Sequence, residues 1–219
     1  MSTATGARSG AGELLADRAY VELRDQIITL AIPPGAPLDE EALGRALQLG
    51  RTPLREAVKR LALENLVSVY PRRGTFVAEI NITDLAHISD VRVELEGHAS
   101  YRAAQRLTPE QRAELGGLLA ELAEPGTSAA ADLMELDARI HRFVYRCAGN
   151  PYLRDTLERY LNLSLRIWYL VLGRLPHLFE RVHEHAELLE AIRDGEADRA
   201  RAIATDHVET FEREIRGVL

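Results

Sequence analysis

The segment 38–78 constrains the fold of this 219-residue chain most, because two short helix patterns and a hairpin pattern follow one another there. The first helix pattern begins after Asp39, a good N-cap, and a turn at residues 48–50 follows it. The second pattern has Thr52 as its expected N-cap and Pro53 at the first helical position, where proline is tolerated. Two short helices joined in this way predict a helix-turn-helix.

The second of these helices presents a row of cations. Its expected inward stripe consists of Leu54, Val58 and Leu61. Arg51, Arg55 and Lys59 recur at a spacing of four residues and therefore share another face of the helix. Such a row is most often a solvated face, so it does not by itself indicate a contact with nucleic acid.

The hairpin pattern that follows supplies further evidence. Residues 67–70 and 75–78 have the composition of two short β-strands, and a turn with proline and glycine joins them. Arg72 and Arg73 at the tip can meet phosphate or the minor groove, and Gly74 lets the backbone approach closely. An arginine-tipped hairpin directly after a helix-turn-helix is typical of a wing. The order of the elements therefore predicts a winged helix-turn-helix that binds double-stranded DNA.

The net charge of −7 is distributed unevenly along the chain. Residues 1–80 carry ten Arg or Lys and ten Asp or Glu, whereas residues 81–219 carry seventeen and twenty-four. DNA binding depends on a local basic patch rather than on the charge of the whole chain. The acidic excess of the second part is therefore compatible with a DNA-binding first part.

The sequence carries no membrane signal. No apolar run approaches the roughly 20 residues that a membrane span needs, and residues 1–12 lack the apolar region of a secretory signal. Cys147 is the only cysteine, so no internal disulfide can form. We expect it to be a small buried side chain, with a reactive thiol as the alternative. These features predict a cytoplasmic protein with no membrane partner.

The chain is expected to be mainly α. We expect a disordered arm over residues 1–12, a winged helix-turn-helix domain over 13–79, a linker over 80–83 and an all-α six-helix bundle over 84–219. The first domain opens with an amphipathic helix whose apolar face consists of Leu15, Ala19, Val21, Leu23, Ile27 and Ile28. The bundle helices are expected at 84–106, 108–123, 129–148, 151–173, 176–194 and 196–217.

Four polar residues fall on inward apolar faces of the expected bundle. Asp137 and His141 lie four residues apart in one helical stripe, and His185 and His207 lie in line with apolar residues of the fifth and sixth helices. A lone inward histidine is more often a hydrogen-bonded core residue than a ligand. Four convergent ligand types favour a metal site, for which bundle cores are a usual place. The ligand set suits a divalent ion: zinc first, with nickel, manganese, cobalt or iron as alternatives.

The segment from about residue 15 to 78 resembles the DNA-binding domain of the GntR family of bacterial regulators. The residues that carry the resemblance are 32–35, 38–40, Leu43, the run Arg-Thr-Pro-Leu-Arg-Glu-Ala at 51–57, 60–61, 66–67 and 71–74. It implies that Arg51, Thr52 and Arg55 contact bases or phosphates and that the wing tip, Arg73 and Gly74, reaches the minor groove. We expect Lys59 and Arg72 to help bind the DNA backbone.

This segment departs from the family pattern at three positions. Gln48 stands where the family usually has glycine, and Gly50 stands where it usually has serine or threonine. Glu41 stands where a basic residue is common. We expect a missing phosphate contact at Gly50 and an altered sequence preference from Glu41, with the fold retained.

The second part of the chain resembles the FCD effector domain that accompanies GntR-type readers. The matching pieces are Arg92 with Leu95 and Glu96, Asp137 with His141 and Asn150, 184–185 with 191–192, and 194–195 with His207. The resemblance implies a divalent metal held by Asp137, His141, His185 and His207, with water or a small carboxylate effector completing the shell. Six helices rather than seven indicate the VanR-like subgroup.

Two arginines are candidates for the effector pocket. Arg92 can pair with an effector carboxylate through two hydrogen bonds, and a structural ion pair is the equally favoured alternative. Arg166 can line the cavity together with Trp168 and Tyr169, although ordinary packing accounts for the two aromatic side chains as well.

Together these features predict a ligand-responsive transcription regulator. Two chains would pair, so that two recognition helices meet the half-sites of a pseudo-palindromic operator. The family resemblance favours a repressor that its effector releases. Two alternatives stay open. One is a metal-dependent hydrolase-like enzyme, for which no separate inward general base is evident. The other is a metal sensor, in which the ion itself is the signal.

Overall fold

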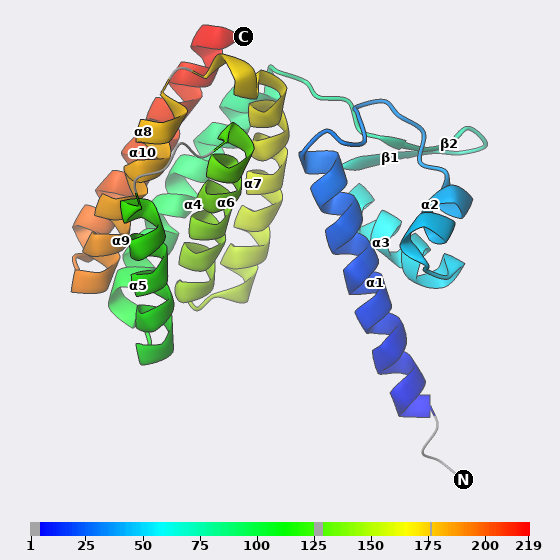
Figure 1. Ribbon diagram of the computed structural model, residues 1–219, viewed down its shortest axis with the longest axis horizontal. Helices are drawn as coiled ribbons and strands as arrows, with labels where there is room; N and C mark the ends of the chain where they lie inside the picture. Colours follow the sequence, from blue (N-terminus) through cyan, green and yellow to red (C-terminus); the bar gives the residue numbers. More distant parts are fainter. Residues whose placement is uncertain (1–4, 125–128, 176) are drawn as a thin grey trace. The chain divides into compact units, whose positions relative to one another are not determined.

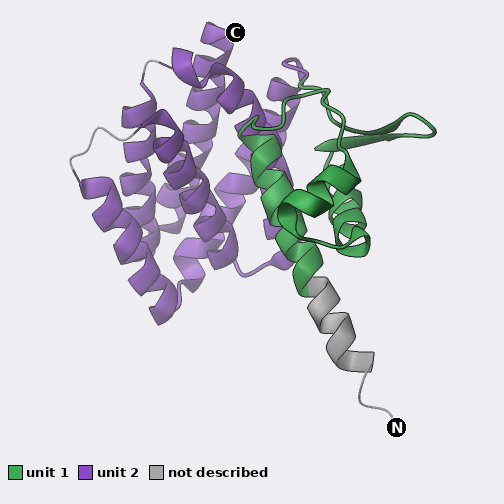
Figure 2. Cartoon of the chain, turned by 45° about the vertical axis from the view of Figure 1, so that its right-hand side comes forward, with its two compact units in different colours: residues 1–80 green, residues 81–219 purple. Residues whose placement is uncertain are grey.

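The computed structural model describes residues 5–124, 129–175 and 177–219, with side chains described from residue 14 onward. The chain divides into two compact units, residues 1–80 and 81–219 (Figure 2). The expected division of the chain into a reader and a bundle was drawn at residues 80–83, next to this boundary. No helix in the described ranges is both long enough and apolar enough to cross a membrane.

The first unit contains three helices and a hairpin in its described residues (Figure 1). These elements are α1 (Thr5–Ile28), α2 (Glu40–Leu47), α3 (Arg51–Leu63), β1 (Val67–Tyr70) and β2 (Gly74–Val77). Helices α1 and α3 pack together, and the inward stripe expected for α3 is buried. The antiparallel hairpin pairs Val67 with Val77. The predicted winged helix-turn-helix is thereby confirmed.

The wing is tied to the chain segment that precedes α2. The backbone amide of Gly35 donates to the carbonyl of Val77 at 3.0 Å, and that of Leu38 donates to the carbonyl of Thr75 at 2.8 Å. Strand β2 is therefore hydrogen-bonded on both edges, which fixes the base of the wing on the helix-turn-helix. Asp39 caps α2 as expected, because its side chain accepts from two backbone amides of the first turn.

Helix α1 begins earlier than the sequence pattern predicted. It starts at Thr5, so residues 5–12 of the expected disordered arm are helical, while residues 1–4 lie outside the described residues. The segment contains no proline, which would end a helix, although three of its eight residues are glycines, which are unfavourable in a helix interior. The buried face also differs from the expected one, because Leu15 and Val21 are 41% and 43% exposed. Ala19, Leu23 and Ile27, spaced by four residues, form the core stripe instead.

The expected N-cap of α3 was wrong by two residues. The helix begins at Arg51 and its N-cap is Gly50, so Thr52 lies inside the first turn. Gln48 already ends α2 in the left-handed conformation, with φ of 56°, so a shorter turn suffices. The residue that the family usually places at position 48, glycine, adopts this conformation without a steric cost.

The second unit is entirely helical in its described residues (Figure 1). Its elements are α4 (Asp84–Arg106), α5 (Pro109–Ala123), α6 (Ala130–Cys147), α7 (Pro151–Val171), the 3-10 turn η1 (Leu172–Arg174), α8 (Leu178–His183), α9 (His185–Asp194) and α10 (Ala197–Val218). Helix α4 contacts α6, α7, α9 and α10, and its longest interface is with α10. It is therefore the central helix of this unit.

The expectation of six bundle helices was wrong for the described residues, which form seven α-helices. The helix expected at 176–194 breaks at Glu184 into α8 and α9, and residue 176 lies outside the described residues. Nδ1 of His185 lies 3.1 Å from the carbonyl oxygen of Val182. In a continuous α-helix this carbonyl would accept a hydrogen bond from the backbone amide of Ala186. The helix count that indicated the VanR-like subgroup therefore does not hold.

Candidate functional site

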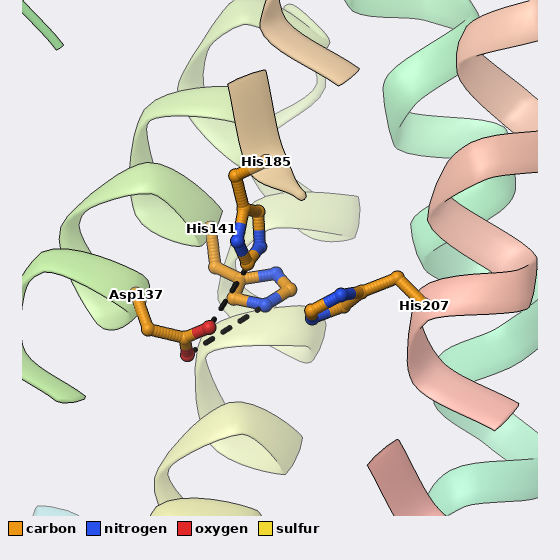
Figure 3. A group of neighbouring side chains, drawn as sticks. All are labelled: Asp137, His141, His185 and His207. Carbon is orange, nitrogen blue, oxygen red and sulfur yellow. Dashed lines mark ion pairs between the residues drawn. The ribbon is translucent and has the colours of Figure 1, made fainter. Parts of the chain in front are cut away.

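Four side chains from three helices meet in the core of the second unit (Figure 3). Asp137 and His141 lie one turn apart on α6, His185 begins α9, and His207 lies in the middle of α10. All four are buried, with exposed fractions between 1% and 8%. The amphipathic pattern predicted the inward direction of each, and the structure brings the four together.

The donor atoms of the four side chains lie too far apart to hydrogen-bond to one another, but close enough to bind one ion together. Oδ2 of Asp137 lies 3.8 Å from Nε2 of His141, and Oδ1 lies 3.7 Å from Nε2 of His185. The four donor atoms all lie within 4.8 Å of one another. Ligand atoms about 2.0–2.2 Å from a tetrahedral ion are separated by roughly 3.5 Å. A small inward movement of the side chains would thus suit one ion.

The cluster also holds a group of buried polar atoms that lack partners. Oδ2 of Asp137 and the Nε2 atoms of His141, His185 and His207 make no hydrogen bond in the described structure. Buried polar atoms are seldom left in this state, because each forfeits its interaction with water. One carboxylate oxygen and three imidazole nitrogens are suitable donors for a divalent transition metal. The residues present therefore fit a metal ion.

The second ring nitrogen of two of the histidines is already engaged. Nδ1 of His141 lies 2.8 Å from Oε2 of Glu96, and Nδ1 of His185 faces the carbonyl of Val182. When Nδ1 carries the proton and donates it, the lone pair is left on Nε2. In both residues this is the nitrogen that faces the cluster.

Burial and neighbouring charges set the protonation of the cluster. Burial lowers the pKa of His185 to about 4 and holds the pKa of His207 well below its usual range. Burial opposes ionisation of Glu96 too, but Arg92 and His141 outweigh it and lower the pKa of this carboxyl to about 2. Burial disfavours the charged form of His141, yet the nearby carboxylates raise its pKa. His185 and His207 are thus neutral near pH 7, as metal ligation requires.

Arg92 is engaged within the core. Its Nε donates to Oε1 of Glu96 at 2.6 Å, and its guanidinium carbon lies 4.9 Å from the centre of the Trp168 ring. Of the two roles expected for Arg92, the structure contains the ion pair. Glu96 was not singled out as a site residue in the sequence. Its spacing of four residues from Arg92, which places both side chains on one face of the helix, was the available signal.

A pocket of about 370 Å³ between α9 and α10 reaches the cluster from solvent. Its lining consists of Glu184, His185, Glu187, Leu188, Ala202, Ile203, Asp206 and His207. His185 and His207 are the buried polar residues of this lining. The carboxylates of Glu184, Glu187 and Asp206 are exposed. Arg166 is buried on α7 and does not line this pocket.

The expected DNA-contacting residues are exposed on the first unit. Arg51, Thr52, Arg55 and Lys59 all lie on the solvent side of α3, opposite its buried stripe. Arg55 pairs with Glu40 of α2 at 3.3 Å, and Lys59 pairs with Glu56 at 2.7 Å. Because Gly50 provides no side-chain cap, the first amides of α3 have no capping acceptor.

The wing tip projects a second set of exposed cations. Arg72 and Arg73 occupy the turn between β1 and β2, and the guanidinium of Arg73 lies 5.7 Å from the ring centre of Tyr70. Arg72 has a φ of 63° and Gly74 a φ of 108°, so the turn uses left-handed conformations at both positions. Only glycine adopts the second without strain.

Comparison with known proteins accounts for both units. The family model for bacterial regulatory proteins of the gntR family matches residues 15–77, and the model of the FCD domain matches residues 87–210. The chain belongs to the GntR family, with an FCD domain as its second unit. The predicted membership of the GntR family and the predicted FCD domain are thereby confirmed.

Curated relatives of this GntR regulator are themselves regulators. The chain is 25% identical over 200 residues to the HTH-type transcriptional repressor RspR of Escherichia coli (strain K12), covering 91% of this chain and 88% of RspR. It is 31% identical over 172 residues to the HTH-type transcriptional regulator McbR of the same organism, covering 78% and 74%. The solved structure of E. coli McbR/YncC shares the fold, with a TM-score of 0.77, 23% identity and coverage of 93% and 97%. The chain is therefore a DNA-binding transcription regulator.

Proposed function

We propose that this protein is a repressor that binds a pseudo-palindromic operator as a homodimer and responds to a small carboxylate effector at a buried divalent metal. The observation that supports the sensor half of this proposal is the set of four unpartnered buried donor atoms on Asp137, His141, His185 and His207. The reader half is supported by the family and by the exposed cations of α3 and the wing. The repressor sign is suggested by the relative RspR, which is named a repressor.

In the reader, Arg51 and Arg55 would contact bases, because they project from the first turns of the recognition helix. N-terminal residues of that helix are the ones that reach base edges in the major groove. The uncapped amides at the start of α3 and the hydroxyl of Thr52 would bind phosphate. Lys59, Arg72 and Arg73 would add backbone or minor-groove contacts.

The reader proposal is tested by Arg55→Ala, with Arg154→Ala as the control. Both arginines are exposed and ion-paired, but Arg154 lies on α7 in the second unit. A base contact by Arg55 predicts a loss of roughly 1–3 kcal/mol in specific affinity, measured by fluorescence anisotropy on the operator. The control should bind as the parent does. Equal affinity of Arg55→Ala and the parent would contradict the assigned role.

The metal proposal is tested by elemental analysis of the tag-free protein. About one divalent ion per chain is expected in the parent and in the control variant His98→Ala, whose histidine is exposed on α4. Asp137→Ala and His207→Ala should fold and lose the ion. Absence of metal in the parent, even after loading with zinc, nickel and manganese, would overturn the proposal.

The charge of the occupied cluster favours an anionic effector. The buried Arg92–Glu96 pair is neutral overall, so a divalent ion with Asp137 as its one anionic ligand leaves one uncompensated positive charge. A buried net charge is costly, and a monocarboxylate that binds the ion removes it. The pocket of about 370 Å³ is of the size that small molecules occupy, and it reaches His185 and His207.

Regulation requires that the effector bind two arrangements of the sensor with different affinity. The coupling between effector and operator is typically about 1–3 kcal/mol. Operator anisotropy in the presence of metal, with a panel of small carboxylates, measures it directly. Release by a carboxylate only in metal-loaded protein supports the proposal. A response to free metal with no organic ligand would instead identify a metal sensor.

A further inference from the structure

The buried carboxylate of Glu96 connects the metal cluster to the central helix α4, which contributes none of the four candidate ligands. Oε2 of Glu96 lies 2.8 Å from Nδ1 of His141, and Oε1 lies 2.5 Å from Nη2 of Arg92 and 2.6 Å from its Nε. The side chains of all three residues are at most 4% exposed. Each carboxylate oxygen of Glu96 therefore has its own buried partner, Arg92 for Oε1 and His141 for Oε2.

His141 and His185 differ in what holds their Nδ1 atoms. His185 faces a backbone carbonyl, that of Val182, whose position is set by the end of α8. His141 faces the charged side chain of Glu96, which reaches it from another helix. The orientation of the His141 ring consequently depends on a residue that can be replaced.

We propose that Glu96 is a positioning residue of the metal centre, accepting the Nδ1–H of His141 and thereby directing its Nε2 lone pair toward Asp137 and the ion. Arg92 holds Glu96 in this place through the paired contacts to Oε1. The inference rests on the proposed binding of a divalent metal. It extends that proposal by assigning a supporting residue to α4.

The chemistry of this arrangement favours tighter metal binding. A carboxylate that accepts from the remote nitrogen fixes the imidazole tautomer and makes the other nitrogen a stronger donor. Fixing the ring before the ion arrives also removes an ordering cost from binding. Loss of such an outer partner typically weakens metal affinity about 10- to 100-fold.

The test compares metal affinity and metal-free stability in Glu96→Gln, Glu96→Asp and the control Glu94→Gln. Glutamine keeps an oxygen that can accept the Nδ1–H but loses the charge. Aspartate keeps the charge and the partner for Arg92 but is one methylene group too short to hold both contacts. Glu94 is exposed on α4, so its variant makes the same chemical change away from the cluster.

Affinity for zinc is measured by competition with a chromophoric chelator, and cobalt(II) absorption reports the ligand field. Metal-free stability is measured separately by urea unfolding with Trp168 fluorescence. We expect both Glu96 variants to bind zinc about 10- to 100-fold more weakly with an altered cobalt spectrum, and Glu94→Gln to match the parent.

A purely structural Glu96 would lower the metal-free stability of the variants without changing zinc affinity or the cobalt spectrum. That outcome overturns the inference and leaves the metal proposal intact. A parent protein that binds neither zinc nor cobalt would overturn both.

Discussion

The close approach of α4 and α10 predicts that one glycine in this unit resists replacement by alanine. A Cβ atom added at Gly97 would lie 2.7 Å from Oγ1 of Thr205 and 3.3 Å from Cγ of Arg201, both on α10. A Cβ added at Gly116, on α5, would meet no atom within 4 Å. Both glycines lie inside helices, so the two substitutions share the same gain in helix propensity.

The expected magnitudes follow from two opposing effects. Alanine is favoured over glycine in a helix interior by about 0.8–1.0 kcal/mol, and overpacking typically costs about 1–3 kcal/mol. Gly116→Ala should therefore raise the free energy of unfolding by up to about 1 kcal/mol. The free energy of unfolding of Gly97→Ala should be about 1–3 kcal/mol lower than that of Gly116→Ala. Adding Thr205→Ala to Gly97→Ala should restore part of this lost stability, because it removes the contacting Oγ1.

The assay is urea unfolding followed by the fluorescence of Trp168, the only tryptophan, which is buried in α7. It reports the second unit alone, which matters because a two-unit chain need not unfold in one step. Because His207 lies two residues from Thr205, Gly97→Ala should also weaken zinc binding. If Gly97→Ala stabilised the unit as much as Gly116→Ala, the argument from α4–α10 packing would be refuted.

Three further predictions address other features of the chain. Gln48→Gly should stabilise the reader by about 0.5–1 kcal/mol, because it relieves a left-handed non-glycine residue, and hydrogen exchange of the α3 amides measures this gain. In metal-free protein, burial lowers the pKa of His185 from its ordinary 6.5 to about 4. Between pH 4 and 6.5 this histidine is therefore protonated in the unfolded chain but neutral in the folded chain. Stability should therefore fall as the pH is lowered from 6.5 to 5, by about 1.5 kcal/mol from this residue, and urea unfolding of His185→Gln should show a shallower dependence. Burial raises the pKa of Cys147 to about 12, so native protein at pH 8 should react with iodoacetamide roughly 1000-fold more slowly than the urea-unfolded chain; equal rates would contradict its burial.

Local patterns were sufficient for the reader. The cap at Asp39, the inward stripe of α3 and the arginine-tipped hairpin each depend on residues close in sequence, and each was correctly predicted. The errors in this region concern ends of helices. The start of α1 and the N-cap of α3 depend on competition between nearly equal backbone conformations, which a hydrophobic pattern does not resolve.

The bundle shows where local patterns stop being informative. Helical periodicity placed Asp137 and His141 on one face because residues four apart are neighbours in any α-helix. The same periodicity predicted that His185 and His207 face inward. It could not predict that α6, α9 and α10 bring the four side chains close enough to bind one ion. The break at Glu184, beside which the His185 ring faces the carbonyl of Val182, cannot be read from a pattern that fits one continuous helix.

The sequence by itself determined the order of the elements in the reader, the family, and the helix faces that the polar residues of the bundle occupy. Only the tertiary structure decided which residues meet across those faces, as with Glu96 of α4 and His141 of α6. The physical reason is that periodicity fixes the direction of a side chain about its own helix axis. The partner it meets depends on how helices distant in sequence are packed, and that packing is set by the whole core.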